Sequence, residues 1–300
     1  MSTQGTPPEA GELSAEHGTR GATDGWLEPP QPQDLVVTLL GSYVRGRRDS
    51  VWSSGLVRLL AEFGFSTGAS RVALARLARR NLITRVKDGR LVSYQVTERT
   101  ERLLAEGDLR IFSLGQERPN DELITVLWHT LPEECRLERG RLARRLRFLG
   151  FGSIQDATWI APGDREQEVV LVVRDLKVEE HCSLLIGSPS TSLSLTPMIE
   201  RAWDSSAVDE RYRAFIDQFA PYRSATSRRQ LDDAQAFEVR TRCIHTFRTF
   251  PSLDPVLPES MAPTSRLRTK AARLFDTVYA GLETASLRHF DLVTQPGSGT

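Results

Sequence analysis

Several residue types and patterns are scarce in this 300-residue chain, and each shortage narrows its possible functions. The three cysteines, Cys135, Cys182 and Cys243, are far apart and outside any CxxC spacing, which argues against a disulfide framework and a zinc site. We interpret them as buried free thiols. No apolar run approaches the roughly 18 residues that cross a bilayer, and the N-terminus lacks a basic start followed by an apolar core. We therefore expect a cytoplasmic protein with no membrane partner.

Motifs that carry catalysis are also missing. The histidines are few and separated, and the HExxH, GxSxG, GxGxxG and Walker-type patterns are absent from the sequence. The chain therefore offers no nucleophile with a neighbouring base, no metal cage and no glycine-rich phosphate cradle. We expect neither an enzyme nor a bound cofactor or metal.

Charge of one sign is not in excess overall, because 39 basic residues balance 39 acidic ones. The distribution is uneven, however. Between residues 34 and 113 there are 14 basic and 8 acidic side chains, and 14 − 8 leaves this segment at +6. Positive charge gathered in one part of a neutral chain indicates a polyanionic partner such as nucleic acid.

The same segment has the pattern of a winged helix-turn-helix. Residues 34–44 have an apolar stripe and predict a helix capped by Asp34, and residues 56–63 predict a second helix that stops at Gly64. Ser66 and Thr67 begin a third helix, with Val72, Leu74, Ala75, Leu77 and Ala78 as its inward face. Residues 82–86 and 91–96 are strand-like and flank an Asp-Gly turn, which predicts a β-hairpin, the wing. A further helix opens at Thr97 and is expected to end at Gly107.

This arrangement predicts binding to double-stranded DNA, because a helix fits the major groove and a duplex attracts cations along its phosphates. The start of the third helix and the wing approach DNA first. The predicted DNA-binding residues are therefore Ser66, Thr67, Ser70, Arg71, Arg76, Lys87 and Arg90. An interaction scaffold that uses the winged helix without DNA stays open as an alternative.

The rest of the chain divides by composition and periodicity. Residues 1–33 have hardly any bulky apolar side chain and predict a disordered acidic tail before the DNA-binding unit of residues 34–113. Residues 120–190 predict a β-α-β-α-β succession, an α+β sandwich in which residues 169–173 fit either a helix or a strand. Residues 197–293 have helical spacing throughout and predict a helical C-terminal domain.

Two groups of basic residues are candidates for holding a ligand. The basic helix around residues 141–149 carries Arg144 and Arg147, which could contact the phosphates of a nucleotide, extend the DNA contact, or simply face solvent. Arg240, His245 and Arg248 share one predicted helix and could line a cleft between domains, although salt bridges to nearby acids are an equal possibility.

Several short motifs occur in the order typical of one family. They are residues 51–53 (VWS), 59–64 (LLAEFG), 71–77 (RVALARL), 142–152 (LARRLRFLGFG), 159–162 (WIAP), 236–240 (AFEVR) and 254–258 (DPVLP). With these motifs the chain resembles the PaaX-type repressors, a family named for control of phenylacetate degradation, over about residues 39–292.

The resemblance implies an α+β protein with an N-terminal winged helix-turn-helix, a central ferredoxin-like (Cas2-like) domain and a helical C-terminal domain. It also implies a homodimeric repressor that leaves its operator DNA when an aryl-acyl-CoA such as phenylacetyl-CoA binds. Half-sites about one helical turn apart, roughly 34 Å, or a multiple of it would suit such a dimer. Activation stays open beside repression. A Cas2-like nuclease is a further alternative, but Asp121 has no companion carboxylate at a spacing that suits a metal.

Overall fold

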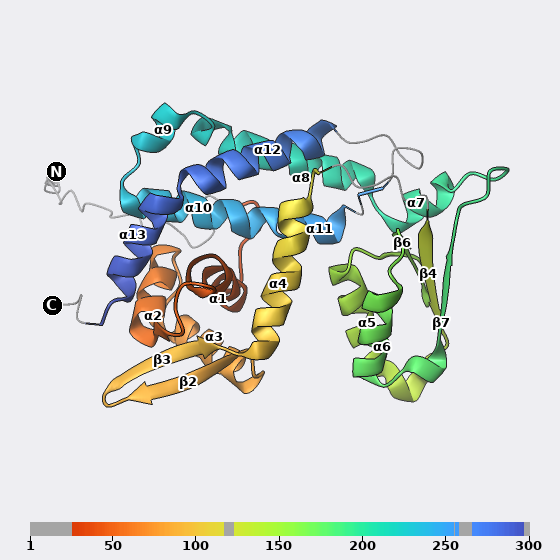
Figure 1. Cartoon of the computed structure of the whole chain (residues 1–300), viewed down its shortest axis with the longest axis horizontal. Helices are drawn as coiled ribbons and strands as arrows, with labels where there is room; N and C mark the ends of the chain where they lie inside the picture. Colours follow the sequence, from red (N-terminus) through yellow and green to blue (C-terminus); the bar gives the residue numbers. More distant parts are fainter. Residues whose placement is uncertain (1–25, 117–122, 255, 258–265, 297–300) are drawn as a thin grey trace, which may run out of the picture.

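The computed structural model describes residues 26–116, 123–254, 256–257 and 266–296 as a mixed α and β structure with two separate sheets. Figure 1 shows the N-terminal elements below a layer of C-terminal helices, with the second sheet and its helices at the opposite end. Residues 1–25 of the expected tail, as well as Asp121, lie outside the described residues.

The N-terminal unit contains three helices packed together. They are α1 (Pro32–Leu39), which continues into a π-helical turn (Leu40–Val44), α2 (Ser53–Glu62) and α3 (Thr67–Arg79). The expectation that Asp34 caps the first helix is wrong: the N-cap is Gln31, Pro32 occupies the first turn, and Asp34 lies inside that turn. The end of α2 was placed correctly, since the chain leaves the helix through Gly64 at a φ of 84°.

A three-stranded antiparallel sheet completes this unit. Its strands are β1 (Val51–Trp52), β2 (Ile83–Asp88) and β3 (Leu91–Val96), in the order β1-β3-β2. The predicted hairpin is confirmed: Asp88 pairs with Leu91, so that Gly89 and Arg90 alone form the turn. Gly89 has a φ of 55°, a conformation that glycine adopts without steric cost.

A long helix, α4 (Glu98–Ser113), leads away from the hairpin. The side chain of Thr97 accepts a hydrogen bond from the Thr100 amide and caps the helix, as its sequence position predicts. The expected end at Gly107 is wrong, because the helix continues through this glycine to Ser113. At its far end Arg110 donates to the Phe148 carbonyl oxygen (2.7 Å) and to Glu168 (3.0 Å) and so connects α4 to the central unit.

The central unit is a β-α-β-β-α-β succession. It comprises β4 (Ile124–His129), α5 (Arg136–Phe148), β5 (Gly152–Gln155), β6 (Thr158–Pro162), α6 (Glu166–Leu176) and β7 (Cys182–Gly187). The sheet is antiparallel with the order β5-β6-β4-β7. The expected succession lacked β5, a short strand with an irregular register at Ser153 and Gln155. Residues 169–173, open between helix and strand by propensity, belong to α6 and bury Val169, Val172 and Val173.

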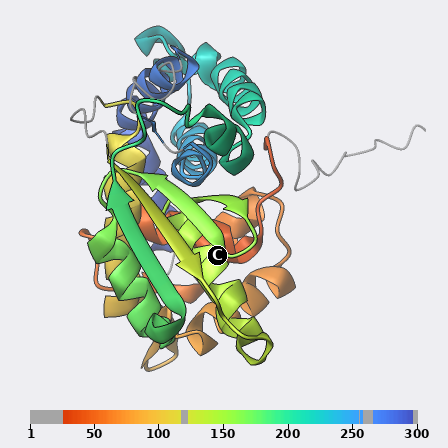
Figure 2. The same cartoon turned by 90° about the vertical axis from the view of Figure 1, so that its right-hand side faces the viewer.

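Helices α5 and α6 cover one face of this sheet, and Figure 2 looks onto the other face. Leu142, Leu146 and Leu149 point into the core as predicted. On the opposite face of β4 and β7, Trp128 is 51% exposed and Leu185 is 69% exposed. One face of the central sheet therefore stays partly open in the single chain.

The C-terminal residues are helical, as their spacing predicts. The helices are α7 (Thr196–Ala202), α8 (Ser205–Phe219), α9 (Ala225–Arg229), α10 (Asp233–Phe247), α11 (Phe250–Leu253), α12 (Arg266–Gly281) and α13 (Glu283–Thr294). Short 3-10 turns occur at Glu133–Cys135, Glu179–His181 and Ala220–Tyr222. Stacked aromatic rings fill the core between the helices, and the ring centroids of Phe247 and Phe275 are 4.0 Å apart.

The N-terminal unit does not close its core alone. Phe237 of α10 and Phe290 of α13 belong to the same buried cluster as the apolar residues of α1, α2 and α3. Tyr43 stacks on Phe290 with ring centroids 5.0 Å apart, and its hydroxyl bonds to Thr241 (2.8 Å). The predicted domain boundary at residue 113 therefore lies between two parts of the sequence, the N-terminal unit and helices α10 and α13, that contribute to one hydrophobic core.

The expectation of a tail reaching to residue 33 is wrong for residues 26–33. Trp26 is buried, and its ring lies 5.7 Å from Phe63 and 5.1 Å from His245. Arg242 lies over the same ring, 4.7 Å from its centroid. An indole that buries this much area contributes roughly 2–3 kcal/mol, so Trp26 helps to hold the segment against the core.

Candidate nucleic-acid interface

Helix α3 packs against the core with one face and exposes the other face to solvent. Ser66 is the N-cap, and its side chain accepts a hydrogen bond from the Ala69 amide (3.2 Å), which satisfies one of the open donors of the first turn. Ala73, Leu74 and Leu77 bury the inner face against the core. The outer face is therefore presented to solvent along the whole helix.

The predicted contact residues of α3 divide into exposed and buried ones. Ser66, Thr67, Arg71 and Arg76 are exposed. Ser70 is fully buried, and its hydroxyl donates to the Ser66 carbonyl oxygen (3.0 Å). The expectation that Ser70 contacts DNA is corrected on this ground, because its side chain is turned into the helix packing and already bonded.

The hairpin β2–β3 projects from the same unit and carries further basic side chains. Lys87 and Arg90, both predicted as contacts, are exposed near the turn, and Arg85 is exposed on β2. Figure 1 shows the hairpin and α3 together at the lower edge of the molecule, on the side opposite the C-terminal helices. Both elements are thus accessible to one large partner.

The basic residues of the N-terminal unit separate into paired and unpaired groups. Arg45 pairs with Glu101 and Asp108, and Arg47 and Arg48 both pair with Asp291 of α13. In contrast, no ion pair within the described part of the chain involves the basic residues of α3 and the hairpin, namely Arg71, Arg76, Arg79, Arg80, Arg85, Lys87 and Arg90. The arginines that connect elements of the fold are paired with carboxylates, and the basic residues on α3 and the hairpin are available to an anionic partner.

Three stretches of the chain match known protein families. Residues 31–100 match the PaaX-like protein family, residues 118–197 the PaaX protein central Cas2-like domain, and residues 203–292 the PaaX-like protein C-terminal domain. The chain belongs to the PaaX family. The resemblance seen in the sequence is confirmed.

Two individual proteins resemble this PaaX family member over most of its length. The transcriptional repressor PaaX of Escherichia coli (strain K12) is 23% identical over 266 residues, which cover 86% of this chain and 83% of the relative. The solved structure of the uncharacterized protein Rv0674 from Mycobacterium tuberculosis has a TM-score of 0.51 and 18% identity, covering 88% of this chain and 100% of the other. The second likeness concerns the fold alone.

The three ligand candidates on α10 and at its C-cap bond to groups within the protein. Arg240 is 2% exposed, lies over the Tyr279 ring at 3.8 Å and the Tyr43 ring at 5.1 Å, and donates to the Tyr279 carbonyl oxygen. His245 bonds to Thr38 through Nδ1 (2.8 Å), and Arg248 donates to the same hydroxyl (2.6 Å). The hydrogen bond of Arg240 connects α10 to α12, and those of His245 and Arg248 connect it to α1. These internal bonds favour a structural role for the three residues over the expected ligand cleft.

Burial also determines the charge state of His245, where α10 contacts α1. Desolvation, with the neighbouring Arg248 cation adding to it, lowers the pKa of His245 to about 3. Burial likewise lowers the pKa of Arg248, partly offset by Asp34. His245 is therefore neutral at physiological pH and acts as a hydrogen-bonding and ring-packing group.

The two candidates on α5 lie at the surface. Arg144 and Arg147 are exposed, and Arg147 lies over the Trp159 ring, 5.3 Å from its centroid. Their neighbour Arg145 is engaged with Asp175. The two predicted groups thus differ in exposure: the α5 arginines are exposed, whereas Arg240 is buried and His245 and Arg248 are half-buried.

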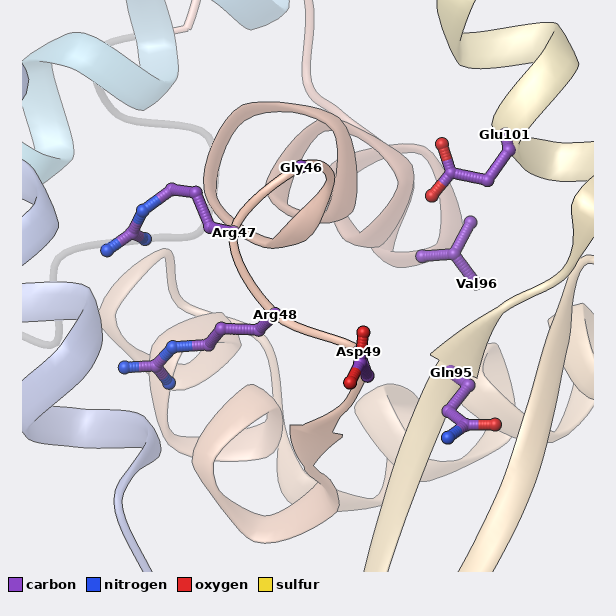
Figure 3. Close-up of a pocket in the computed structure, with 7 residues that line it drawn as sticks. All are labelled: Gly46, Arg47, Arg48, Asp49, Gln95, Val96 and Glu101. Carbon is purple, nitrogen blue, oxygen red and sulfur yellow. The ribbon is translucent and has the colours of Figure 1, made fainter.

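A hollow of about 650 Å³ lies between the loop at residues 46–49, the end of β3 and the first turn of α4. Figure 3 shows its lining, with Arg47 and Arg48 pointing toward α13 and away from Gln95 and Glu101. Both guanidinium groups bond to Asp291. Because Arg47 and Arg48 already bond to Asp291, they are not directed at a phosphate or carboxylate inside the hollow.

No cluster of three or more potential metal ligands exists in the described ranges, and none of the described helices could span a membrane.

Sequence reasoning assigned Val72 and Ala75 to the inner face of α3, and this is wrong. Val72 is 48% exposed and Ala75 is also exposed, while Ser70 and Ala73 are buried in their place. Arg79, Arg80 and Arg85 are further exposed cations that were not among the chosen contact residues. Arg79 and Arg80 share the outer face of the helix with Arg71 and Arg76, and this helical spacing could have identified them as contact residues.

Proposed function

We propose that the protein is a DNA-binding transcriptional regulator, and specifically a repressor, whose N-terminal unit is a winged helix-turn-helix. Helix α3 would lie in the major groove and the β2–β3 hairpin would be the wing. Three packed helices followed by a two-stranded hairpin support this description. The order β5-β6-β4-β7 and the β-α-β-β-α-β succession support a ferredoxin-like central domain.

The observation that carries the proposal is the set of unpaired cations on α3 and the hairpin. Salt bridges within the protein would lower the gain from phosphate contacts, since the internal partner must first be released. Arg71, Arg76, Lys87 and Arg90 have no such partner among the described residues. Binding to a duplex then releases condensed counterions, which favours association at low salt.

The test is the salt dependence of binding to a genomic operator fragment, with Arg71→Ala compared to Arg102→Ala. Arg102 is an exposed helical arginine as well, but it pairs with Glu98 on α4. We expect Arg71→Ala to weaken binding by about 1–3 kcal/mol or to reduce the slope of log K against log salt by about 1. Arg102→Ala should bind as the wild type does. Absence of binding to genomic fragments at low ionic strength would refute the proposal and leave the interaction scaffold.

We further propose that the repressor is a homodimer. The open face of the central sheet supports this, because Trp128 and Leu185 expose apolar area that a second copy would cover. Trp128→Glu should shift the protein to monomer in sedimentation velocity, whereas Leu109→Glu on α4, a residue that is 75% exposed, should not. A dimer that persists in Trp128→Glu would place the interface elsewhere.

The proposed effector is an aryl-acyl-CoA such as phenylacetyl-CoA. Arg144 and Arg147 support contacts with its phosphates because both are exposed cations on one helix. Arg240, His245 and Arg248 are no longer part of this proposal. Phenylacetyl-CoA should lower operator affinity of the wild type, and the double variant Arg144→Ala and Arg147→Ala should require a higher concentration for the same effect. If no acyl-CoA changes operator affinity, the effector proposal fails while DNA binding stands.

A further inference from the structure

The outer face of α3 carries an apolar side chain at its centre. Val72 is 48% exposed, whereas Ser70, Ala73, Leu74 and Leu77 are the buried residues of the helix. With 3.6 residues per turn, about 100° per residue, the buried residues fall on one side and Val72 lies nearly opposite their midpoint. Its branched side chain therefore lies on the face of α3 that is turned away from the core.

The surroundings of Val72 are cationic. Arg71 and Arg76 flank it on the two sides of the helix, and Ala75 and Arg79 follow it along the exposed face. Neither Arg71 nor Arg76 is ion-paired among the described residues. Valine is a weaker helix former than the polar residues that usually occupy a solvated face, so local helix stability does not account for its presence. The flanking charges make a polyanion the partner that fits this face.

We propose that Val72 selects thymine by packing against its 5-methyl group in the major groove. This inference rests on the proposed function, in which α3 enters that groove. A valine side chain has no donor or acceptor and does not read the hydrogen-bonding edges of bases. The thymine methyl is the apolar group that the major groove presents, and cytosine has a hydrogen at the same carbon. Val72 would thus distinguish T·A from C·G where the arginines contact phosphate or guanine.

The expected size of the effect follows from the area of one methyl group. Burial of one such group is worth about 0.8 kcal/mol, which corresponds to about a fourfold change in Kd. The preference is therefore expected to be modest at each position and confined to one or two base pairs in each half-site.

The test starts from random-sequence duplexes, from which the full-length protein selects its preferred sites. In a selected duplex each thymine is then replaced singly by deoxyuridine, which removes the methyl group and keeps base pairing intact. We expect about fourfold weaker binding of the wild type at one or two positions. Val72→Ala should bind the thymine and uracil duplexes equally at those positions. Val72→Thr, which retains one γ-methyl group, should keep part of the discrimination.

Leu109→Ala is the matched control, because Leu109 is an exposed apolar residue on α4 outside the proposed interface. It should show the wild-type preference for thymine. If the wild type binds thymine and uracil duplexes equally at every position, or if Val72→Ala keeps the discrimination, the inference is overturned while salt-dependent DNA binding stands. A change of oligomeric state in Val72→Ala, with thymine preference intact, would assign this side chain to a protein contact and also overturn it. Failure to select any duplex would refute the proposed function itself.

Discussion

At the scale of single residues, the C-terminal core depends on a buried charged group. Asp254 is 4% exposed, accepts a hydrogen bond from Tyr212 (2.7 Å), and receives two from Arg268 (2.5 and 2.6 Å). Burial and the adjacent Asp254 carboxylate raise the pKa of the Tyr212 phenol, so it remains a donor. This carboxylate connects α8, α12 and the segment after α11.

Asp254→Ala should destabilise the protein strongly, because it removes the buried carboxylate that accepts hydrogen bonds from both Arg268 and Tyr212. Loss of one partner of a buried pair costs about 3–5 kcal/mol, measured as the free energy of unfolding in urea. Arg102→Ala removes an exposed pair on α4 and should cost about 0.5 kcal/mol or less. Equal and small effects for both variants would show that the buried pair is dispensable.

His245 gives a residue-scale prediction for pH. Its pKa in the folded protein is about 3, below the ordinary value of 6.5, so the unfolded chain binds the additional proton between these values. Stability from this residue is therefore complete above about pH 6.5 and falls as the pH drops toward 3, by up to about 1.4 kcal/mol per pH unit.

The check is urea unfolding of the wild type and His245→Gln at pH 7, 6 and 5. The stability difference between them should be constant above about pH 7 and should decrease with acidification, because glutamine does not titrate. A difference that stays the same from pH 7 to pH 5 would contradict the buried neutral imidazole.

At the scale of elements, two glycines within helices have opposite surroundings. A Cβ added at Gly55 of α2 would lie 2.7 Å from Thr294 Cα of α13, whereas one added at Gly107 of α4 would meet nothing within 4 Å. Gly55 thus allows the close approach of α2 and α13, and Gly107 has no such role.

Gly55→Ala should destabilise the protein by about 1–3 kcal/mol through overpacking, despite the better helix propensity of alanine. Gly107→Ala should stabilise it by about 0.5–1 kcal/mol. Thermal or urea unfolding of the two variants checks both signs. Stabilisation by Gly55→Ala would mean that α2 and α13 separate at no cost.

Some of the helices and strands could be predicted from the sequence, and others could not. Helix α5 and the β2–β3 hairpin were predictable because apolar periodicity and turn residues are local signals. Gly107 was misleading because a glycine inside a helix costs only about 1 kcal/mol, and the contacts of Arg110 favour continuation of the helix. The short, irregular strand β5 has too few residues to establish an alternation.

The candidate site was predictable only in part for a related reason. Exposed cations such as Arg71 and Arg76 follow from helix geometry, but the outward position of Val72 depends on which neighbour the helix packs against. Arg240 and Arg248 look like surface cations in the sequence. Their contacts include residues about 200 positions earlier, Tyr43 and Thr38, which no local pattern indicates.

At the scale of the whole molecule, the proposed reading unit is stabilised by the C-terminal helices. Phe237 and Phe290 lie in its core, Asp291 pairs with Arg47 and Arg48, and Glu62 bonds to His289 (2.9 Å). The contacts involve both apolar and charged groups. Motion of α13 would therefore be transmitted to the helices that support α3.

A fragment of residues 26–113 should fail to form a stable fold, because it would expose the apolar surface that Phe237 and Phe290 cover. We expect poor dispersion in its two-dimensional NMR spectrum and no cooperative thermal transition, in contrast to the full chain. In the full chain, Phe290→Ala should cost about 3–5 kcal/mol. A fragment that folds cooperatively would show that residues 26–113 fold without the C-terminal helices.

Helix α10 supplies Phe237 to one core and Phe247 to the other. For the design of hybrid proteins, this means that the proposed DNA-binding unit cannot be exchanged on its own. A graft onto a foreign effector module would have to carry α10 and α13 with it, or repack the surface they leave behind. Recombination between family members should accordingly tolerate crossovers around the central sheet far better than a junction directly after the wing.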